Sequence, residues 1–216
     1  MAEEVKKKCV IICASPYNQP DFIRDIIGVN DYVICADGGF DTALKAGIKP
    51  DIVIGDFDSK EKDSNIENDA QSIVLPTDKD DTDGIYCVKY GISKGFDKFL
   101  ILGATGGRTD HMYANLFLLK FMYKNRCDGV LEDKFTYIKY TEENLTLSAK
   151  GKTVSVLPFG CESAEVTLKG FKYKADRLAM DSSFPIGISN VAISDNAEIN
   201  VYSGGVLVIV NKSMDL

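Results

Sequence analysis

The segment at residues 99–111 reads FLILGATGGRTDH. It opens with the continuous apolar run Phe99–Leu102, which is typical of a strand buried on both faces of a parallel sheet. A glycine-rich turn follows, and residues 110–123 continue with apolar side chains at helical spacing. A strand that passes through a tight turn into a helix is the repeating unit of an α/β fold.

The first half of the chain repeats this unit. The other expected strands are Cys9–Ala14, Tyr32–Cys35, Ile52–Ile54 and Ser72–Leu75. The other expected helices lie around Phe22–Ile27, Phe40–Ala46 and Thr82–Ser93. Alternating strands and helices predict that residues 1–133 form an open, mainly parallel, Rossmann-like α/β sheet with right-handed crossovers.

The pattern changes after about Asp133, where short strand-like runs follow one another without a helical pattern. The runs are Tyr137–Lys139, Leu145–Leu147, Thr153–Leu157, Glu165–Leu168, Val191–Ile193, Glu198–Val201 and Val206–Val210. Turn signals such as Lys150-Gly151 and Asp195-Asn196 separate them. Residues 134–216 are therefore predicted to form a second domain, an all-β sandwich.

Composition narrows the function classes. The net charge of −7 argues against a nucleic-acid binder, which needs a basic face for phosphates. No apolar run approaches the roughly 20 residues that span a bilayer, and the N-terminus lacks the pattern of a signal peptide, so we expect a cytoplasmic protein without a membrane partner. The six cysteines form no CxxC pair and fit small buried hydrophobes in a reducing compartment. His111 is the single histidine, which excludes a His-rich zinc site.

Aspartates and glycines gather directly after the predicted strands, where open α/β sheets bind their ligands. These residues are Asp37, Gly38 and Gly39 after the second strand, Asp56 and Asp58 after the third, Asp80 and Asp83 after the fourth, and Arg108 and Asp110 after the fifth.

The carboxylates favour a magnesium site. Asp56 and Asp58 flank one residue and would point to the same side in an extended chain, and Asp80 and Asp83 would share a face at a helix start. Crowded carboxylates repel one another unless a cation is present. Oxygen ligands without His or Cys suit Mg²⁺ held jointly with substrate phosphates. The alternative is a set of ordinary turn and N-cap aspartates.

The segment Gly103–His111 favours a phosphate site. Its glycines let backbone N–H groups approach an anion, the following helix N-terminus adds a favourable dipole, and Arg108 can bind phosphate oxygens. The spacing matches neither a P-loop nor GxGxxG, and a plain tight turn is the alternative. For His111 we weigh a substrate contact or proton relay against orientation of Asp110 or helix capping.

These segments together resemble the thiamine pyrophosphokinase family. Its pattern is ADGG, PDxxIGDFDS, KDxTD and GxxGGRxDH, and this chain carries Ala36–Gly39, Pro50–Ser59, Lys79–Asp83 and Gly103–His111 in the same order. A Ser-Asn pair late in the β domain is matched by Ser189 and Asn190.

The resemblance implies a catalytic α/β domain that binds ATP and Mg²⁺, a β-sandwich that binds thiamine, and a homodimer with shared active sites. It implies Mg²⁺ ligation by Asp56, Asp58 and Asp83 with Asp80 close by, nucleotide binding by Asp37, Gly38, Gly39 and Arg108, and thiamine contacts from Ser189 and Asn190. Asp110 would lie where metal, phosphate and the thiamine hydroxyl meet, so Asp110, Arg108 and Asp83 are the expected catalytic residues. The expected reaction is in-line attack of the thiamine hydroxyl on the β-phosphorus of ATP, with AMP leaving.

Two features depart from the family pattern. The loop after the first strand reads Ala14-Ser15-Pro16-Tyr17, where many members carry glycine or Asn-Gly. The chain has no Trp, so stacking on thiamine would come from Tyr or Phe, with Tyr173 and Phe184 as candidates that could equally belong to the core.

Two other functions are compatible with the same sequence motifs. A metal-dependent phosphohydrolase could use the same aspartates to activate water. A nucleotide-sensing or scaffold protein could keep the fold without turnover, although the Asp and Arg positions of every motif are filled.

Overall fold

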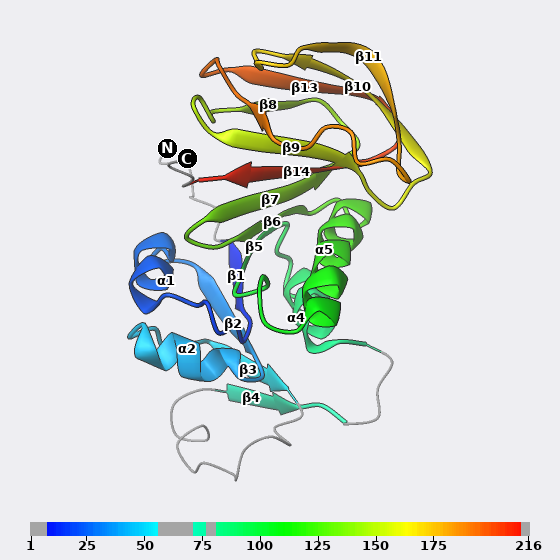
Figure 1. Cartoon of the computed structure of the whole chain (residues 1–216). Coiled ribbons are helices and arrows are strands. Elements are labelled where there is room, and N and C mark those ends of the chain that lie inside the picture. Colours follow the sequence, from blue (N-terminus) through cyan, green and yellow to red (C-terminus); the bar gives the residue numbers. More distant parts are fainter. Residues whose placement is uncertain (1–7, 56–70, 77–80, 213–216) are drawn as a thin grey trace, which may run out of the picture. The chain divides into compact units, whose positions relative to one another are not determined.

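A computed structural model describes residues 8–55, 71–76 and 81–212 (Figure 1). The chain divides into two compact units, Met1–Asp133 and Lys134–Leu216, which we call unit 1 and unit 2. In the part of the chain that the structure describes, no helix is both long and apolar enough to cross a membrane.

Unit 1 is built on one sheet. Its strands are β1 (Cys9–Ile12), β2 (Tyr32–Ala36), β3 (Ile52–Gly55), β4 (Gln71–Val74), β5 (Lys98–Leu102) and β6 (Asp128–Glu132). They lie in the order β6-β5-β1-β2-β3-β4, and the pairings described within this unit are parallel. The carboxyl ends of the strands therefore meet at one edge. Strand β6 was not predicted from the sequence.

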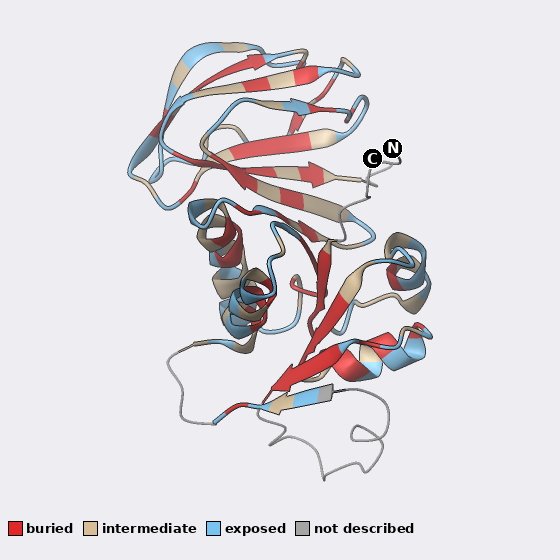
Figure 2. Ribbon diagram, turned by 180° about the vertical axis from the view of Figure 1, so that it is seen from behind, coloured by how far each residue is buried: buried red, intermediate tan, exposed pale blue. Residues whose placement is uncertain are grey.

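Helices cover both faces of this sheet (Figure 1). They are α1 (Pro20–Ile26), α2 (Gly39–Lys45), α4 (Asp83–Ser93) and α5 (Thr109–Lys124). On one face, Ile23 of α1 and Phe40 of α2 pack in a cluster with Val10 and Ile12 of β1. On the other face, α4 comes so close to the sheet that a Cβ on Gly91 would lie 2.6 Å from the Phe99 ring. Figure 2 shows that β1, β2 and β3 are buried along almost all of their length, which explains their continuous apolar runs. The edge strand β4 differs from the expectation of burial on both faces, because Ser72 and Val74 are exposed.

The helical spacing in residues 110–123 predicts one apolar face of Met112, Leu116, Leu119 and Tyr123, and of these only Leu119 is fully buried. Leu118, Leu119 and Met122 are buried, whereas Met112 and Leu116 are only partly buried. The C-terminal half of α5 packs on β6, where Met122 fills the space that a Cβ on Gly129 would need. Because β6 was not foreseen, neither was this packing surface.

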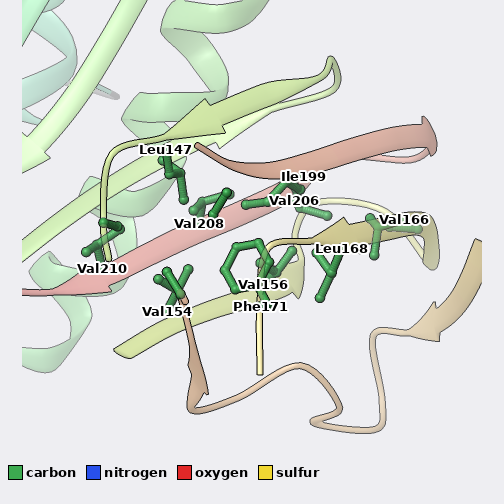
Figure 3. Close-up of a cluster of buried hydrophobic side chains, with 14 of the residues drawn as sticks. Leu147, Val154, Val156, Val166, Leu168, Phe171, Ile199, Val206, Val208 and Val210 are labelled. Atoms are coloured by element: carbon green, nitrogen blue, oxygen red, sulfur yellow. The ribbon is translucent and has the colours of Figure 1, made fainter. Parts of the chain in front are cut away.

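Unit 2 consists of two antiparallel sheets, in the orders β12-β9-β14-β7 and β11-β10-β13-β8. The strands are β7 (Thr136–Thr141), β8 (Leu145–Leu147), β9 (Thr153–Pro158), β10 (Ser163–Lys169), β11 (Ala175–Asp181), β12 (Asn190–Val191), β13 (Ala197–Ser203) and β14 (Val206–Asn211). Side chains from both sheets form one core, in which Figure 3 shows Phe171 beside Val156 and Leu168. This is the expected β-sandwich.

Strand β11 was missed at the sequence level because most of its side chains are exposed. It pairs with β10 through an irregularity between Val166 and Leu168, and Arg177 has a positive φ of 47°. A strand of this kind lacks the alternating apolar pattern that identifies a half-buried strand.

The cysteines are confirmed as free thiols, buried except for Cys161, which is partly exposed. Burial is the main reason why the pKa of the Cys9 thiol is raised to about 12. The five buried cysteines therefore act as small apolar side chains of the interior, as expected from the sequence.

Candidate functional site

The loop after β2 lies between the ends of β1 and β3. The N–H of Asp37 donates a hydrogen bond to the carbonyl of Ile54 (2.9 Å), and Asp37 has a positive φ of 42°. A Cβ on Gly39 would lie 1.9 Å from the carbonyl oxygen of Ile12, so only glycine fits where α2 begins. The structure therefore brings the predicted residues Asp37, Gly38 and Gly39 to the carboxyl edge of the sheet.

The glycine-rich loop, which we define as Gly103–Gly107, leads from β5 toward α5. Gly103, Gly106 and Gly107 have φ values of 68°, 77° and 68°, a conformation that favours glycine. The amide of Asn115 donates to the carbonyl of Ala104 (3.0 Å) and ties the loop to α5. The loop ends at the N-terminus of a 16-residue helix, where backbone N–H groups and the helix dipole favour an anion.

Arg108 and Asp110 form an ion pair at the start of α5. The Arg108 Nε and Nη2 atoms donate to the two carboxylate oxygens of Asp110 at 3.2 and 2.6 Å, and both side chains are largely exposed. The hydrogen bonds from Arg108 are the main reason why the pKa of Asp110 is lowered to about 2. Asp110 is therefore a carboxylate at neutral pH.

The single histidine lies beside this pair. Its backbone N–H donates to the Asp110 carboxylate at 3.0 Å, so His111 helps to orient Asp110 through the main chain. Its side chain is exposed, and the two functional alternatives for the imidazole stay open.

Asp83 begins α4, where the hydroxyl of Thr82 caps the helix by accepting from the N–H of Ile85 (3.3 Å). The pKa of the Cys13 thiol is raised to about 12, mainly by burial and to a smaller extent by the charge of Asp83. Cys13 directly follows β1, at the carboxyl end of that strand.

The predicted metal site is described only in part. Asp56, Asp58 and Asp80 lie outside the described residues. Among residues 8–55, 71–76 and 81–212, no group of three or more His, Cys, Asp and Glu side chains is placed to hold a metal ion. The magnesium site therefore stays a prediction, with Asp83 as its one described ligand.

The Ser-Asn pair in unit 2 occupies two different environments. Ser189 is exposed, has a positive φ of 57° and donates its backbone N–H to the hydroxyl of Ser155 (3.1 Å). Asn190 is buried, and its side chain binds both the N–H (3.0 Å) and the carbonyl (2.7 Å) of Tyr173. Asn190 thus fixes the segment that presents the exposed Tyr173 ring, whereas its expected contact with a ligand stays a prediction.

Sequence reasoning missed the polar residues of the loop after β1. The Asn18 amide nitrogen donates to the carbonyl of Cys13 (2.9 Å) and to the hydroxyl of Thr42 (3.1 Å). Ser15 donates to the carbonyl of Thr105 (2.7 Å). Thr42 and Thr105 are far from this loop in the sequence, and the only signal was the departure of the loop from the family pattern.

Both units resemble domains of known proteins. Residues 23–131 match the thiamin pyrophosphokinase catalytic domain, and residues 137–206 match the thiamin pyrophosphokinase vitamin B1 binding domain. A thiamine pyrophosphokinase of Bacillus subtilis is 30% identical over 94% of this chain and 97% of its own length. A crystal structure of thiamine pyrophosphokinase from Bacillus subtilis has a TM-score of 0.83 at 27% identity and covers 96% of this chain and all of its own.

A more distant structure supports the fold alone. Yeast thiamin pyrophosphokinase has a TM-score of 0.82 at 16% identity, covering 97% of this chain and 87% of its own. Both family models and a relative that is similar over almost the whole length lead to one assignment. The chain belongs to the thiamin pyrophosphokinase family.

Proposed function

We propose that the chain transfers the pyrophosphoryl group of ATP to the hydroxyl of thiamine, giving thiamine pyrophosphate and AMP. The observation that carries the proposal is the glycine-rich loop, whose positive-φ glycines lead into the N-terminus of α5 beside Arg108 and Asp110. This arrangement suits a phosphate chain that must be held and neutralised during transfer.

In this proposal unit 1 is a Rossmann-like catalytic domain for ATP. The parallel pairing from β6 to β4 supports this, because ligands of such sheets bind outside the carboxyl ends of the strands. Asp37, Gly38 and Gly39 lie at that edge and would contact the nucleotide. The glycine-rich loop would bind its phosphates through backbone N–H groups.

Arg108 would neutralise the phosphates while it remains beside Asp110. A guanidinium carries more N–H donors than the ones it uses on Asp110, so one side chain can bind a carboxylate and a phosphate together. The pair is largely exposed, which leaves it open to a ligand.

Mg²⁺ fits the chemistry of the donor set. The predicted ligands Asp56, Asp58, Asp80 and Asp83 supply only oxygen atoms, as a hard cation requires. The described member, Asp83, begins α4 and acts electrostatically on Cys13 at the end of β1. When bound, the ion would neutralise charge on the phosphate oxygens.

Asp110 would orient the thiamine hydroxyl for attack on the β-phosphorus. Because its pKa is lowered to about 2, the carboxylate is a weak base toward an alcohol. We therefore assign it the acceptance of a hydrogen bond from the hydroxyl and not an early proton abstraction.

Unit 2 would bind thiamine. The exposed Ser189, with Tyr173 held by Asn190, supplies polar and aromatic surface for such a ligand. We also propose that the protein is a cytoplasmic homodimer with shared active sites. This part of the proposal rests on the family assignment.

The test is AMP formation by the purified chain from ATP and Mg²⁺, with and without thiamine. Thiamine-dependent AMP in equal amount to thiamine pyrophosphate is the expected result, and chelation of Mg²⁺ with EDTA should abolish it. Release of phosphate without thiamine would favour a phosphohydrolase. Nucleotide binding without any product would favour a sensing protein.

A further inference from the structure

The loop after β1 lies directly against the glycine-rich loop. The hydroxyl of Ser15 donates to the carbonyl of Thr105 at 2.7 Å, and it also accepts the N–H of Tyr17 at 3.2 Å. The Thr105 hydroxyl in turn donates to the carboxylate of Asp133 at 2.5 Å. Thr105, in the middle of the glycine-rich loop, is thus held through both its backbone and its side chain.

The Tyr17 ring packs on the next residue of that loop. A Cβ on Gly106 would lie 2.1 Å from Cδ2 of the ring, so the ring occupies the place of a side chain. Pro16 approaches Gly107 in the same way, with 3.3 Å to a Cβ built there. Tyr17 is nevertheless 69% exposed, and its position owes little to burial in a core.

Asn18 lies against Gly103, the first residue of the glycine-rich loop. Its side chain lies 2.6 Å from a Cβ built on Gly103, and its amide nitrogen bonds to Cys13 and Thr42. Each of residues 15–18 therefore lies against a residue of the glycine-rich loop.

We infer that Ser15 and Tyr17 are positioning residues that hold the glycine-rich loop in the shape that binds the nucleotide's phosphates, an inference that rests on the function proposed above. A loop with three positive-φ glycines loses much conformational entropy when it becomes ordered. Contacts that order it before the ligand arrives reduce the free-energy cost of binding. The departure from glycine at Ala14–Tyr17 thus has a physical role, because the loop after β1 acts on the nucleotide through its neighbour.

The experiment compares Ser15→Ala, Tyr17→Ala and Tyr17→Phe with the wild type. Calorimetry with Mg²⁺ measures the affinity for α,β-methylene-ATP and for AMP, and steady-state kinetics give KM for ATP and for thiamine. Ser93→Ala is the matched control, because Ser93 also donates its hydroxyl to a backbone carbonyl (2.7 Å) but lies at the far end of α4. Tyr202→Ala removes an exposed tyrosine in unit 2.

Ser15→Ala should weaken binding of the ATP analogue about five- to tenfold, which is the equilibrium equivalent of one net hydrogen bond. Tyr17→Ala, which removes the ring that packs on Gly106, should also weaken this binding. AMP affinity, KM for thiamine and Tm should stay near wild type, and Tyr17→Phe should restore binding. Unchanged affinity for the ATP analogue would overturn the inference. Equal losses for AMP and the ATP analogue would also overturn it, because Tyr17 would then be a contact for the base or ribose.

Hydrogen exchange of the ligand-free protein supplies a second readout. Exchange at residues 103–109 should increase in Ser15→Ala and remain at the wild-type level in Ser93→Ala. This measurement needs no turnover, so a failure of the proposed reaction and a failure of this inference give different results. Equal exchange in both variants would mean that Ser15 does not order the glycine-rich loop.

Discussion

The proposed role of Asp110 gives a specific prediction for the effect of a single substitution on turnover. Asp110→Asn keeps the size of the side chain but removes the charge that orients the thiamine hydroxyl in the proposed reaction. Turnover should fall about 100-fold or more, whereas affinity for α,β-methylene-ATP should change little. Asp195→Asn, at an exposed ion pair with Lys150 in unit 2, is the control and should leave both unchanged. Equal losses of turnover and nucleotide affinity would assign Asp110 to ATP binding.

The charge state of Asp110 gives a second prediction at this scale. Its pKa is lowered from 3.8 to about 2, mainly by the hydrogen bonds from Arg108. Folding therefore favours the ionised form, and this contribution to stability is present above about pH 4 and is lost as the pH falls toward 2. Carboxyl carbon NMR should place the midpoint near 2 in the wild type and closer to 3.8 in Arg108→Gln. The same midpoint in both proteins would contradict the pairing in solution.

At the scale of elements, short polar contacts decide how loops lie against strands. Asn190 belongs to the two-residue strand β12, yet its buried amide accepts the N–H of Tyr173, donates to the carbonyl of Tyr173 and accepts the N–H of Val191 (2.8 Å). Apolar repeats in the sequence predict strands and helices, but they do not predict this set of hydrogen bonds, which we call the Asn190 clamp.

Asn190→Ala should lower the free energy of unfolding by about 2–4 kcal/mol, because it removes a buried side chain that makes hydrogen bonds to three partly buried backbone groups. Chemical denaturation of the whole chain measures the loss. Asn144→Ala is a suitable control, since exposed Asn144 accepts a single N–H from Val201 (3.1 Å) and should cost less than about 1 kcal/mol. Similar costs for the two variants would show that the clamp contributes little.

At the scale of the whole molecule, each unit has a hydrophobic core of its own. The core of unit 2 surrounds Phe171, which is fully buried, and that of unit 1 includes Ile12 and Phe40. Because each core lies within one unit, a substitution in that core should first increase local unfolding of the same unit.

Phe171→Ala should destabilise the protein by about 3–5 kcal/mol through lost burial and a cavity. Hydrogen exchange should increase in residues 134–212 more than in residues 81–133. Val29→Ala, at a fully exposed position of unit 1, is the control and should leave the unfolding free energy within about 0.5 kcal/mol. An equal increase in exchange across both ranges would indicate that the two units unfold as one.

The sequence by itself determined the alternation of strands and helices in the described parts of residues 9–124, the change to β structure near Asp133, and the position of Asp37–Gly39 and of the glycine-rich loop after their strands. Continuous apolar runs, tight glycine turns and helical spacing are local signals, so they can be read from a single chain. Only the tertiary structure decided the rest: the exposed strand β11, the strand β6 on which α5 packs, the clamp of Asn190 and the contact of Ser15 and Tyr17 with the glycine-rich loop. Each of these depends on partners distant in sequence, such as Ser15 and Thr105, and a pairwise contact across that separation leaves no periodic trace in the chain.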